Sequence, residues 1–307
     1  MKILIIGGSG FLGSHLISML LHRGHDITVQ DIVSSSWVSK TKGNDSKMAY
    51  RWKSLFDVIP EDLEEFDCVI NLAAQADVPL SITSPKWTCD LNVQSTISLL
   101  EALRKTRTPT IFMSTDTVYG RVSSDKLPIT EESTLNPTNV YSATKVAMEA
   151  LCHAYRSQFD IPITILRATS IFGERGRLKQ VVPIFVSQAL TNSPITLEGD
   201  GSQSRDFCYV GNLVEGILKA ADLSDSKNKW GIFNIGSGRE TTLKTLADLI
   251  IKLTDSRSEV VYKPWRPGEE GVRLSISIEK ARRFLKYEPQ VSLEDGLVKT
   301  INWMRSL

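Results

Sequence analysis

A glycine-rich turn directly after a short apolar segment constrains the fold of this chain more than any other feature. Residues 3–6 are all Ile or Leu, which is typical of a buried strand, and residues 13–23 have the apolar pattern of a helix. Between them the sequence is Gly-Gly-Ser-Gly-Phe-Leu-Gly. Glycine permits a tight turn and a close approach of backbone to a ligand, and the helix start offers unpaired N–H groups to phosphates. A glycine turn in this context predicts a dinucleotide site. Its predicted cofactor-binding residues are Gly7, Gly10, Phe11, Leu12 and Gly13.

The first two thirds of the chain alternates predicted strands with predicted helices. Further strands are expected at 26–31, 68–72, 110–114 and 163–167, and helices at 93–105 and 142–158. This alternation indicates an α/β fold, a Rossmann-type doubly wound parallel sheet with helices on both faces. Residues 34–47 are polar and predict a long surface loop. From about residue 173, loops with Gly and Pro interrupt shorter elements, which predicts a smaller C-terminal substrate-binding lobe.

An acidic residue ends the second predicted strand. Asp31 follows the glycine turn by one helix and one strand. Its carboxylate can accept hydrogen bonds from the adenosine ribose hydroxyls and would repel a 2′-phosphate. The sequence therefore favours NAD over NADP, with Asp31 as a cofactor-binding residue; the alternative is a solvated aspartate.

A tyrosine and a lysine four residues apart form the candidate catalytic pair. This spacing puts Tyr141 and Lys145 on the same face of a helix. A free tyrosine has a pKa of about 10 and is a poor base at neutral pH, but a nearby ammonium lowers that pKa. The pair can therefore deprotonate an alcohol while NAD⁺ accepts the hydride. Alone, such a pair is common on helix surfaces; after a dinucleotide turn it indicates an active site.

Composition argues against several classes of partner. The formal net charge is +1, so nothing in it favours nucleic acid or an anionic membrane. The four cysteines and four histidines form no metal-binding pattern, and we expect the cysteines to be small hydrophobic residues in a reducing compartment. No apolar segment has the length of a signal peptide or a membrane span. We therefore expect a cytoplasmic protein with no metal ion and no nucleic-acid or membrane partner.

These features, with further segments, resemble the extended short-chain dehydrogenase/reductase family, the NAD-dependent nucleotide-sugar epimerases and dehydratases. The likeness runs along nearly the whole chain. Residues 71–76, Asn-Leu-Ala-Ala-Gln-Ala, look like the segment that lines the NAD cleft, with asparagine where histidine is usual. Residues 57 and 58 look like the pair that contacts adenine. The resemblance implies NAD as the cofactor. It adds these cofactor-binding residues: Asp57, Val58, Leu72, Ala73, Ala74, Gln75, Tyr141 and Lys145.

Two arginine-containing segments extend the resemblance into the substrate lobe. Residues 199–207 contain Arg205, and residues 266–269 begin with Arg266. In the family, the matching arginines bind the diphosphate of a sugar nucleotide, a role that suits the bidentate guanidinium group. The alternative is two arginines in surface loops. Ser170 stands where many members have an asparagine that contacts the nucleotide sugar. The resemblance implies a nucleotide-diphosphate sugar as partner and Thr115, Ser170, Arg205 and Arg266 as substrate-binding residues.

The resemblance also implies the organisation of the chain. The expected Rossmann domain covers residues 1–170 with a return segment at about 206–236, and the expected nucleotide-sugar lobe covers about 171–205 and 237–307. A homodimer is expected as well. Its candidate interface helices lie around 96–103 and 147–155, although core packing explains their apolar faces equally well.

The segment after residue 114 bears on the reaction. Dehydratases of the family carry Thr-Asp-Glu there, in which the Asp and Glu act as acid and base, and decarboxylases usually keep the glutamate. This chain has Thr115, Asp116 and Thr117. A threonine is a poor general base without an activating partner. The resemblance therefore implies a 4-epimerase that acts through a transient 4-keto sugar, with Tyr141 as base, Lys145 as its partner and Thr115 on the C4 oxygen.

Other functions stay open at this point. Asp116 is kept as a candidate catalytic residue, because it leaves a dehydratase or decarboxylase possible, and a nucleotide-sugar dehydrogenase is a third enzyme on the same scaffold. A non-enzymatic dinucleotide sensor would have no need for Tyr141, Lys145 and Thr115 together. The sequence does not choose the sugar, nor UDP over dTDP, GDP or CDP.

Overall fold

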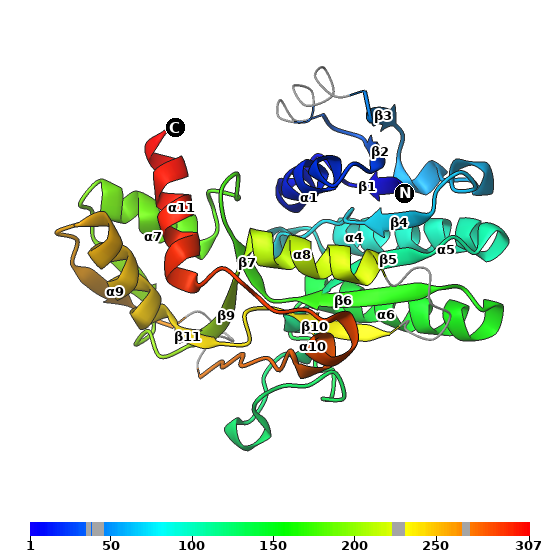
Figure 1. Ribbon diagram of the computed structural model, residues 1–307. Helices are drawn as coiled ribbons and strands as arrows, with labels where there is room; N and C mark the ends of the chain where they lie inside the picture. Colours follow the sequence, from blue (N-terminus) through cyan, green and yellow to red (C-terminus); the bar gives the residue numbers. More distant parts are fainter. Residues whose placement is uncertain (35–37, 39–45, 223–230, 266–270) are drawn as a thin grey trace. The chain divides into compact units, whose positions relative to one another are not determined.

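The computed structural model describes residues 1–34, 38, 46–222, 231–265 and 271–307 (Figure 1). The chain divides into two compact units. Unit 1 contains Met1–Gly120, Leu135–Arg167 and Gly216–Phe233, and unit 2 contains Arg121–Thr134, Ala168–Glu215 and Asn234–Leu307. These units differ from the expected domains at residues 121–134 and 206–215, and by three residues each at 168–170 and 234–236, all of which belong to unit 2. The predicted loop at 34–47 lies almost wholly outside the described residues.

A seven-stranded sheet forms the centre of unit 1. Its strands are β1 (Lys2–Ile6), β2 (Asp26–Asp31), β3 (Met48–Trp52), β4 (Cys68–Asn71), β5 (Thr110–Thr115), β6 (Ile163–Ala168) and β10 (Ile232–Ile235). Their order is β10-β6-β5-β4-β1-β2-β3, and β1 pairs in parallel with both β2 and β4 (Figure 1). The chain therefore changes direction across the sheet at β1, and α/β sheets bind ligands outside the carboxyl ends of strands at such a point. The predicted fold class is confirmed.

The sequence predicts five of these seven strands to within a residue at each end and misses β3 and β10. β3 is the edge strand, and only Met48 of its five residues is buried. Trp52 at its end is 66% exposed. An edge strand that buries so little carries neither an apolar run nor a clear alternation, so the periodicity that identified the other strands is missing from it.

Helices cover both faces of the sheet. In unit 1 they are α1 (Phe11–His22), α3 (Val78–Thr83), α4 (Pro85–Cys89), α5 (Ser95–Thr106) and α6 (Val140–Phe159), with the short turns η1 (Leu55–Asp57), η2 (Pro60–Asp62), η3 (Asp90–Gln94) and η4 (Asp116–Tyr119). Leu4 of β1 shares a hydrophobic core with Leu99 of α5 and Met148 of α6. The next residue, Ile5, points to the other face, where it lies beside Ile17 of α1 around Gly8.

Unit 2 has two small sheets and its own helices. The first sheet has the order β11-β9-β7, and the second pairs β12 with β8. The strands are β7 (Ser170–Phe172), β8 (Ile195–Glu198), β9 (Ser204–Tyr209), β11 (Glu240–Thr242) and β12 (Val260–Lys263). The helices are α7 (Val181–Leu190), α9 (Leu243–Thr254), α10 (Glu279–Leu285), α11 (Leu293–Arg305) and the turn η5 (Ser124–Lys126), while α8 (Val210–Ala221) begins in unit 2 and ends in unit 1.

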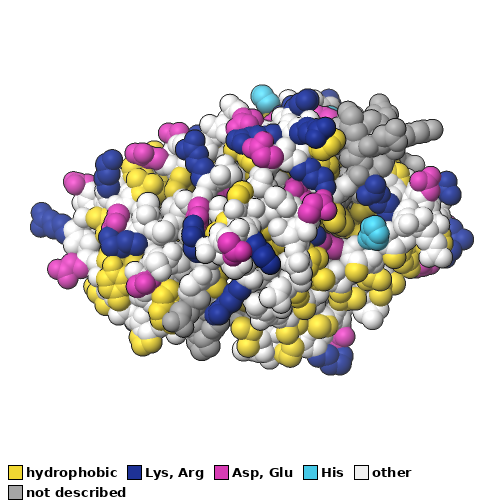
Figure 2. Space-filling model, turned by 90° about the horizontal axis from the view of Figure 1, so that it is seen from below, with side chains coloured by type: hydrophobic (Ala, Val, Ile, Leu, Met, Phe, Trp, Pro, Cys, Tyr) yellow, Lys and Arg dark blue, Asp and Glu magenta, His cyan; other side chains and the backbone are white. Residues whose placement is uncertain are grey.

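The distribution of surface charge and the burial of the cysteines can be compared with the expectations drawn from composition. On the face drawn in Figure 2, basic and acidic side chains are interspersed and do not gather by sign. Three cysteines are buried, as expected of small hydrophobic residues, whereas Cys89 is exposed, so that expectation was wrong for this one residue. No helix among the described residues is long and apolar enough to cross a membrane.

Candidate active site

The glycine turn lies at the carboxyl end of β1 and is packed too tightly for side chains. Gly7 has a φ of +77°, and a Cβ atom there would lie 2.6 Å from the backbone nitrogen of Ala73. A Cβ on Gly13 would lie 2.3 Å from the carbonyl oxygen of Gly8, so this glycine lets the first turn of α1 sit against the loop. Gly10 caps α1, and Phe11 and Leu12 form its first turn. No side chain caps the start of α1 by a hydrogen bond, so its first N–H groups suit an anionic ligand.

Asp31 ends β2 beside this turn. One carboxylate oxygen accepts the backbone N–H of Ser9 at 3.0 Å, and the other accepts the N–H groups of Ile32 and Val33 at 2.8 and 3.2 Å. These bonds fix the carboxylate next to the glycine turn. A carboxylate held there can accept a ribose hydroxyl, as the sequence predicts.

The segment after β4 packs against the glycine turn, with Ala73 beside Gly7. Asn71 accepts the N–H of Ala73 through its side-chain oxygen at 3.1 Å, which turns residues 72–74 outward from the strand. Asn92, in the π-helical turn η3, accepts the N–H of Gln75 at 2.8 Å and donates to the Gln75 carbonyl at 3.0 Å. Asn92 also donates to the Thr144 hydroxyl of α6 at 2.9 Å. This buried amide therefore ties the predicted cofactor segment to the helix that carries the catalytic pair.

Sequence reasoning missed Asn92. The only local signal was an amide in a stretch that otherwise predicts helix, and a buried polar residue cannot be distinguished from an exposed one by that signal.

The predicted adenine-contacting residues lie at the end of η1. Asp57 is exposed, whereas Val58 is 7% exposed and belongs to the hydrophobic core of unit 1. The backbone on both sides of them is anchored: Ser54 caps η1 by accepting the N–H of Phe56, and Asp62 accepts the N–H of Ile59 at 3.0 Å. This segment presents Asp57 on a short, fixed turn.

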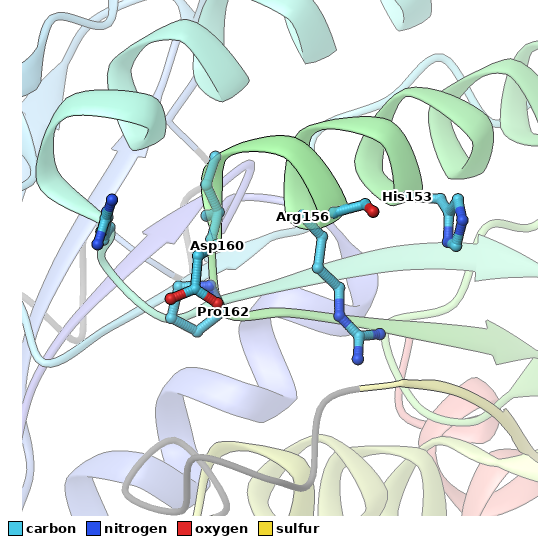
Figure 3. Close-up of a pocket in the computed structure, with 7 residues that line it drawn as sticks. His153, Arg156, Asp160 and Pro162 are labelled. Carbon is cyan, nitrogen blue, oxygen red and sulfur yellow. The ribbon is translucent and has the colours of Figure 1, made fainter.

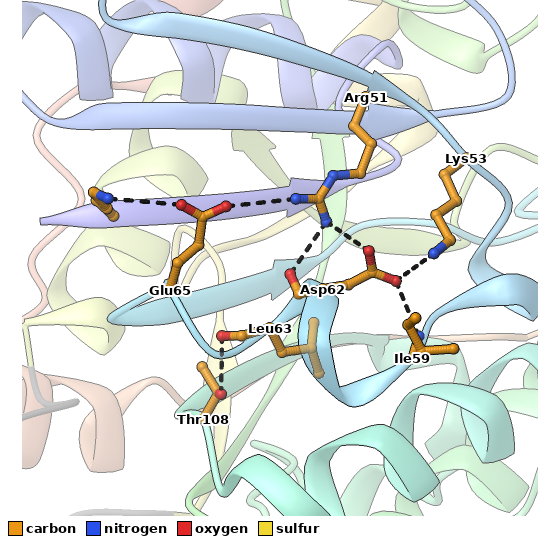
Figure 4. A network of polar contacts seen from close by, with 8 residues as sticks. Arg51, Lys53, Ile59, Asp62, Leu63, Glu65 and Thr108 are labelled. Carbon is orange, nitrogen blue, oxygen red and sulfur yellow. Dashed lines mark hydrogen bonds and ion pairs between the residues drawn. The ribbon is translucent and has the colours of Figure 1, made fainter.

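A network of polar contacts anchors the segment that contains Asp57 and Val58 (Figure 4). Asp62 lies between Lys53, at 2.5 Å, and Arg51, at 3.2 Å, and Arg51 also contacts Glu65 at 3.6 Å. Burial acts to raise the pKa of Asp62, but the bonds from Lys53 and the Ile59 amide and the charges of Lys53 and Arg51 outweigh it, so the pKa lies below its usual value. The network therefore requires the ionised carboxylate.

Helix α6 positions the predicted Tyr141 and Lys145 at its first two turns. Asn139 caps the helix and accepts the N–H of Ser142 at 2.9 Å. Lys145 is 6% exposed and donates to the carbonyl oxygen of Met113, on β5, at 2.8 Å. Burial lowers the pKa of Lys145 to about 8. An ammonium in low dielectric next to Tyr141 would stabilise a phenolate far more than a solvated lysine could.

A chain of hydroxyl groups joins the end of β5 to α6. Thr115 Oγ1 lies 3.1 Å from Thr117 Oγ1, which lies 2.9 Å from Ser142 Oγ, and Ser142 Oγ lies 3.0 Å from Asn139 Oδ1. Thr115 also donates to Asp116 Oδ1 at 3.3 Å. The structure thus brings Thr115, Asp116 and the start of α6 together. Thr117, at the position that decides the predicted reaction, is a structural link in this chain and carries no carboxylate.

The predicted substrate-binding residues of unit 2 meet in one pocket. Ser170 of β7 and Arg205 of β9 both line a cavity of about 330 Å³. Phe185, Phe207 and Leu197 give it apolar walls. Arg266 lies outside the described residues.

A second hollow of about 850 Å³ in unit 1 contains none of the predicted catalytic, cofactor-binding or substrate-binding residues (Figure 3). It is lined by Arg107, which ends α5, and by His153, Arg156 and Asp160 at the last turns of α6. Basic side chains at helix C-termini offset the negative end of the helix dipole, which accounts for the charge found there. Within the described part of the chain, no three His, Cys, Asp or Glu side chains gather in a way that could hold a metal ion.

Comparison with known proteins identifies the family of this chain. The model of the NAD dependent epimerase/dehydratase family matches residues 3–236. A putative UDP-glucose 4-epimerase of Methanocaldococcus jannaschii is 33% identical over 99% of this chain and 98% of its own length. A UDP-N-acetyl-alpha-D-glucosaminuronate decarboxylase of Bacillus cytotoxicus is 32% identical over 100% of this chain and 98% of its own.

Solved structures give the same result. The UDP-glucuronic acid 4-epimerase of Bacillus cereus, in complex with UDP-glucuronic acid and NAD, superposes with a TM-score of 0.89 at 29% identity, covering 100% of this chain and 99% of that one. The relatives thus share the whole length of the chain, while their names cover more than one reaction.

Proposed function

Because the chain belongs to the NAD-dependent epimerase/dehydratase family, we propose that it is a nucleotide-sugar 4-epimerase. The observation that carries this choice is Thr117. Its hydroxyl bridges Thr115 and Ser142, at the position where the resemblance gives eliminating enzymes a glutamate. Without that carboxylate, the site retains the groups needed to remove and return a proton at an alcohol, but lacks one of the pair needed for loss of water.

The glycine turn and Asp31 fit NAD. A side chain at Gly7 or Gly13 would fill the space beside the helix start, and glycine is present at both. Asp31 beside them suits an unphosphorylated ribose. When bound, NAD⁺ supplies a reversible hydride acceptor. We infer that the cofactor-binding residues are those of the glycine turn and of segments 57–58 and 72–75, with Tyr141 and Lys145.

Tyr141 would take the proton of the C4 hydroxyl and later return it. Lys145, held by the Met113 carbonyl, would keep the phenolate form accessible through its charge. Thr115 lies at the carboxyl end of β5 with its hydroxyl in the chain of polar groups, so it can bind the C4 oxygen and hold it toward Tyr141. Because the sugar returns to the alcohol, no net proton or hydride is lost in a turnover.

The pocket of unit 2 would hold the nucleotide. Arg205 offers a guanidinium to the diphosphate, and Ser170 offers a hydroxyl on the neighbouring strand. The apolar walls suit a base or sugar face. A homodimer through α5 and α6 belongs to the same proposal, although Leu99, Leu103, Met148 and Cys152 of these helices pack into the core of their own chain.

Proton NMR in deuterated water, with a panel of UDP-, dTDP-, GDP- and CDP-sugars, tests the proposal. We expect interconversion of C4 epimers without deuterium uptake, and the Tyr141→Phe variant should lose it. Tyr262→Phe is the matched control, because this tyrosine lies on β12 of unit 2, is half exposed and has no role in the proposal. Deuterium at C5 or C6 with a 4-keto product would contradict the proposal and indicate a dehydratase. Release of CO₂ from a sugar acid would contradict it and indicate a decarboxylase.

A further inference from the structure

A buried ion pair lies behind the Tyr141–Lys145 pair. Glu149 follows Lys145 by one turn of α6, on the same face, and meets Arg167 of β6. Arg167 Nη2 donates to Glu149 Oε2 at 2.6 Å and Nε donates to Oε1 at 3.1 Å. The two side chains are 3% and 4% exposed. Neither group has a part in the proton transfer or substrate binding proposed above.

Two more side chains complete the pair. The Ser114 hydroxyl donates to Glu149 Oε1 at 2.5 Å, and Arg167 Nη1 donates to the Tyr119 hydroxyl at 2.8 Å. Ser114 directly follows Met113, whose carbonyl accepts the Lys145 ammonium. Adjacent residues of β5 therefore hold Lys145 and Glu149, so the ion pair and the catalytic pair are fixed to one strand in one register.

A contribution to the stability of the fold does not explain well why this ion pair is buried here. Removing two charges from water is so unfavourable that buried ion pairs can often be replaced by apolar side chains without loss of stability. Charge, however, acts strongly at this distance in a medium of low dielectric. Burial lowers the pKa of Lys145, and the negative charge of Glu149 acts in the opposite direction. Arg167 neutralises part of that negative charge.

Few other charges reach this site. Among the described residues of unit 1, the buried charged side chains are Asp116, Lys145, Glu149 and Arg167. Around them, η4 also presents Tyr119 and α6 presents Tyr141, while the Cys152 thiol stays neutral because burial raises its pKa. The helices α4 and α5 and the turn η3 pack on α6, and their ion pairs Lys86–Asp90 and Glu101–Arg104 lie at the surface. Asp77, at the start of α3, caps its own helix.

We propose that Glu149 and Arg167 are opposed positioning residues that together set the pH at which the Tyr141–Lys145 pair gives up its proton. Glu149 makes the pair hold its proton more tightly, and Arg167 limits that effect. A negative charge raises the proton affinity of an ammonium and of a phenol alike, so the sign holds whichever of the two groups titrates first. The inference rests on the proposed role of the pair, but not on which sugar reaction the pair serves.

The test is the titration of the Tyr141 phenolate by ultraviolet absorbance, each variant being measured against the same variant with Tyr141→Phe. We expect Glu149→Gln to lower the midpoint and Arg167→Gln to raise it, each on the order of one pH unit. Arg167→Lys retains the positive charge and should stay near the wild-type midpoint. The double variant Glu149→Gln/Arg167→Gln removes both charges and should return toward it as well.

Met148→Ala is the matched control for structural damage. It lies on α6 and in the core of unit 1 and carries no titratable group, so it should lower stability without moving the midpoint. If Glu149→Gln does not fold, Arg167→Gln and Ser114→Ala still test the sign, because both leave the Glu149 charge less compensated and should raise the midpoint. Midpoints that stay at the wild-type value in folded variants, or that shift in one direction for both charge removals, would make the pair a purely structural one. Because the titration needs no turnover, its failure is distinct from failure of the epimerase assay.

Discussion

Gly7 and Ala73 approach so closely that a Cβ atom on Gly7 would lie 2.6 Å from the Ala73 backbone nitrogen. The contact joins the glycine turn after β1 to the segment after β4, and these are the two sides of the proposed cofactor crevice. Gly7→Ala must push them apart, so we expect the Kd for NAD to rise at least about tenfold, measured by calorimetry. Gly24→Ala has the same backbone requirement, with a φ of +79°, but its nearest neighbour would be Lys47 Nζ at 3.6 Å. It should lose about 1 kcal/mol of stability and keep its NAD affinity. Equal NAD affinities in the two variants would contradict this account of the crevice.

The lowered pKa of Lys145 predicts that activity and stability change in opposite directions with pH. The ammonium supports Tyr141, and its pKa is about 8 in the folded protein, so turnover should fall as the pH rises above about 8. In the unfolded chain the pKa is about 10.4. Between pH 8 and pH 10.4 the unfolded state binds more protons than the folded state, so the free energy of unfolding rises with pH across this window. The stability contribution of this group is therefore fully present above about pH 10.4 and is lost as the pH falls through 8. Urea unfolding of Lys145→Met should therefore lack this rise in stability. An unchanged slope would mean that Lys145 titrates as a solvated lysine.

Asp62→Asn should destabilise unit 1 in a pH-dependent way. At neutral pH it replaces a carboxylate that accepts from Lys53 and Arg51, and we expect a loss of roughly 1–2 kcal/mol in the free energy of unfolding. The pKa of Asp62 is lowered in the folded state, so its contribution is present above the unfolded value of about 3.9 and lost as the pH falls through the lower folded value. The difference from wild type should thus shrink in acid. Asp90→Asn removes an exposed pair with Lys86 and should leave the free energy of unfolding almost unchanged.

Arg205→Met should weaken substrate binding more than turnover. The guanidinium is proposed to contact the diphosphate, a part of the substrate that does not react, so KM should rise at least about tenfold while kcat changes less. Arg239→Met, an exposed arginine of the same unit, is the control and should leave KM unchanged. A fall in kcat with an unchanged KM would indicate that Arg205 acts in the chemical step and not in substrate binding.

The sequence predicts those parts of the molecule that depend on local pattern. Strands such as β1 and β5 are buried on both faces, so their apolar runs identify them, and the turn after β1 needs glycine for steric reasons that can be inferred from spacing. Asn92, Glu149 and Arg167 could not be found in this way. Their importance comes from burial and from contacts across the sheet, and neither property has a sequence period.

The hydroxyl chain from Thr115 through Thr117 to Ser142 also restricts how this enzyme could acquire a new reaction. A glutamate at position 117 would introduce an acid or base, and it would also replace the Thr117 hydroxyl that lies within hydrogen-bond distance of both Thr115 and Ser142. Asn139 would still cap the helix and hold Ser142. A single substitution at position 117 would therefore change the hydrogen-bond partners of Thr115 and Ser142 at the same moment as it changed the chemistry, so the two effects could not be acquired separately.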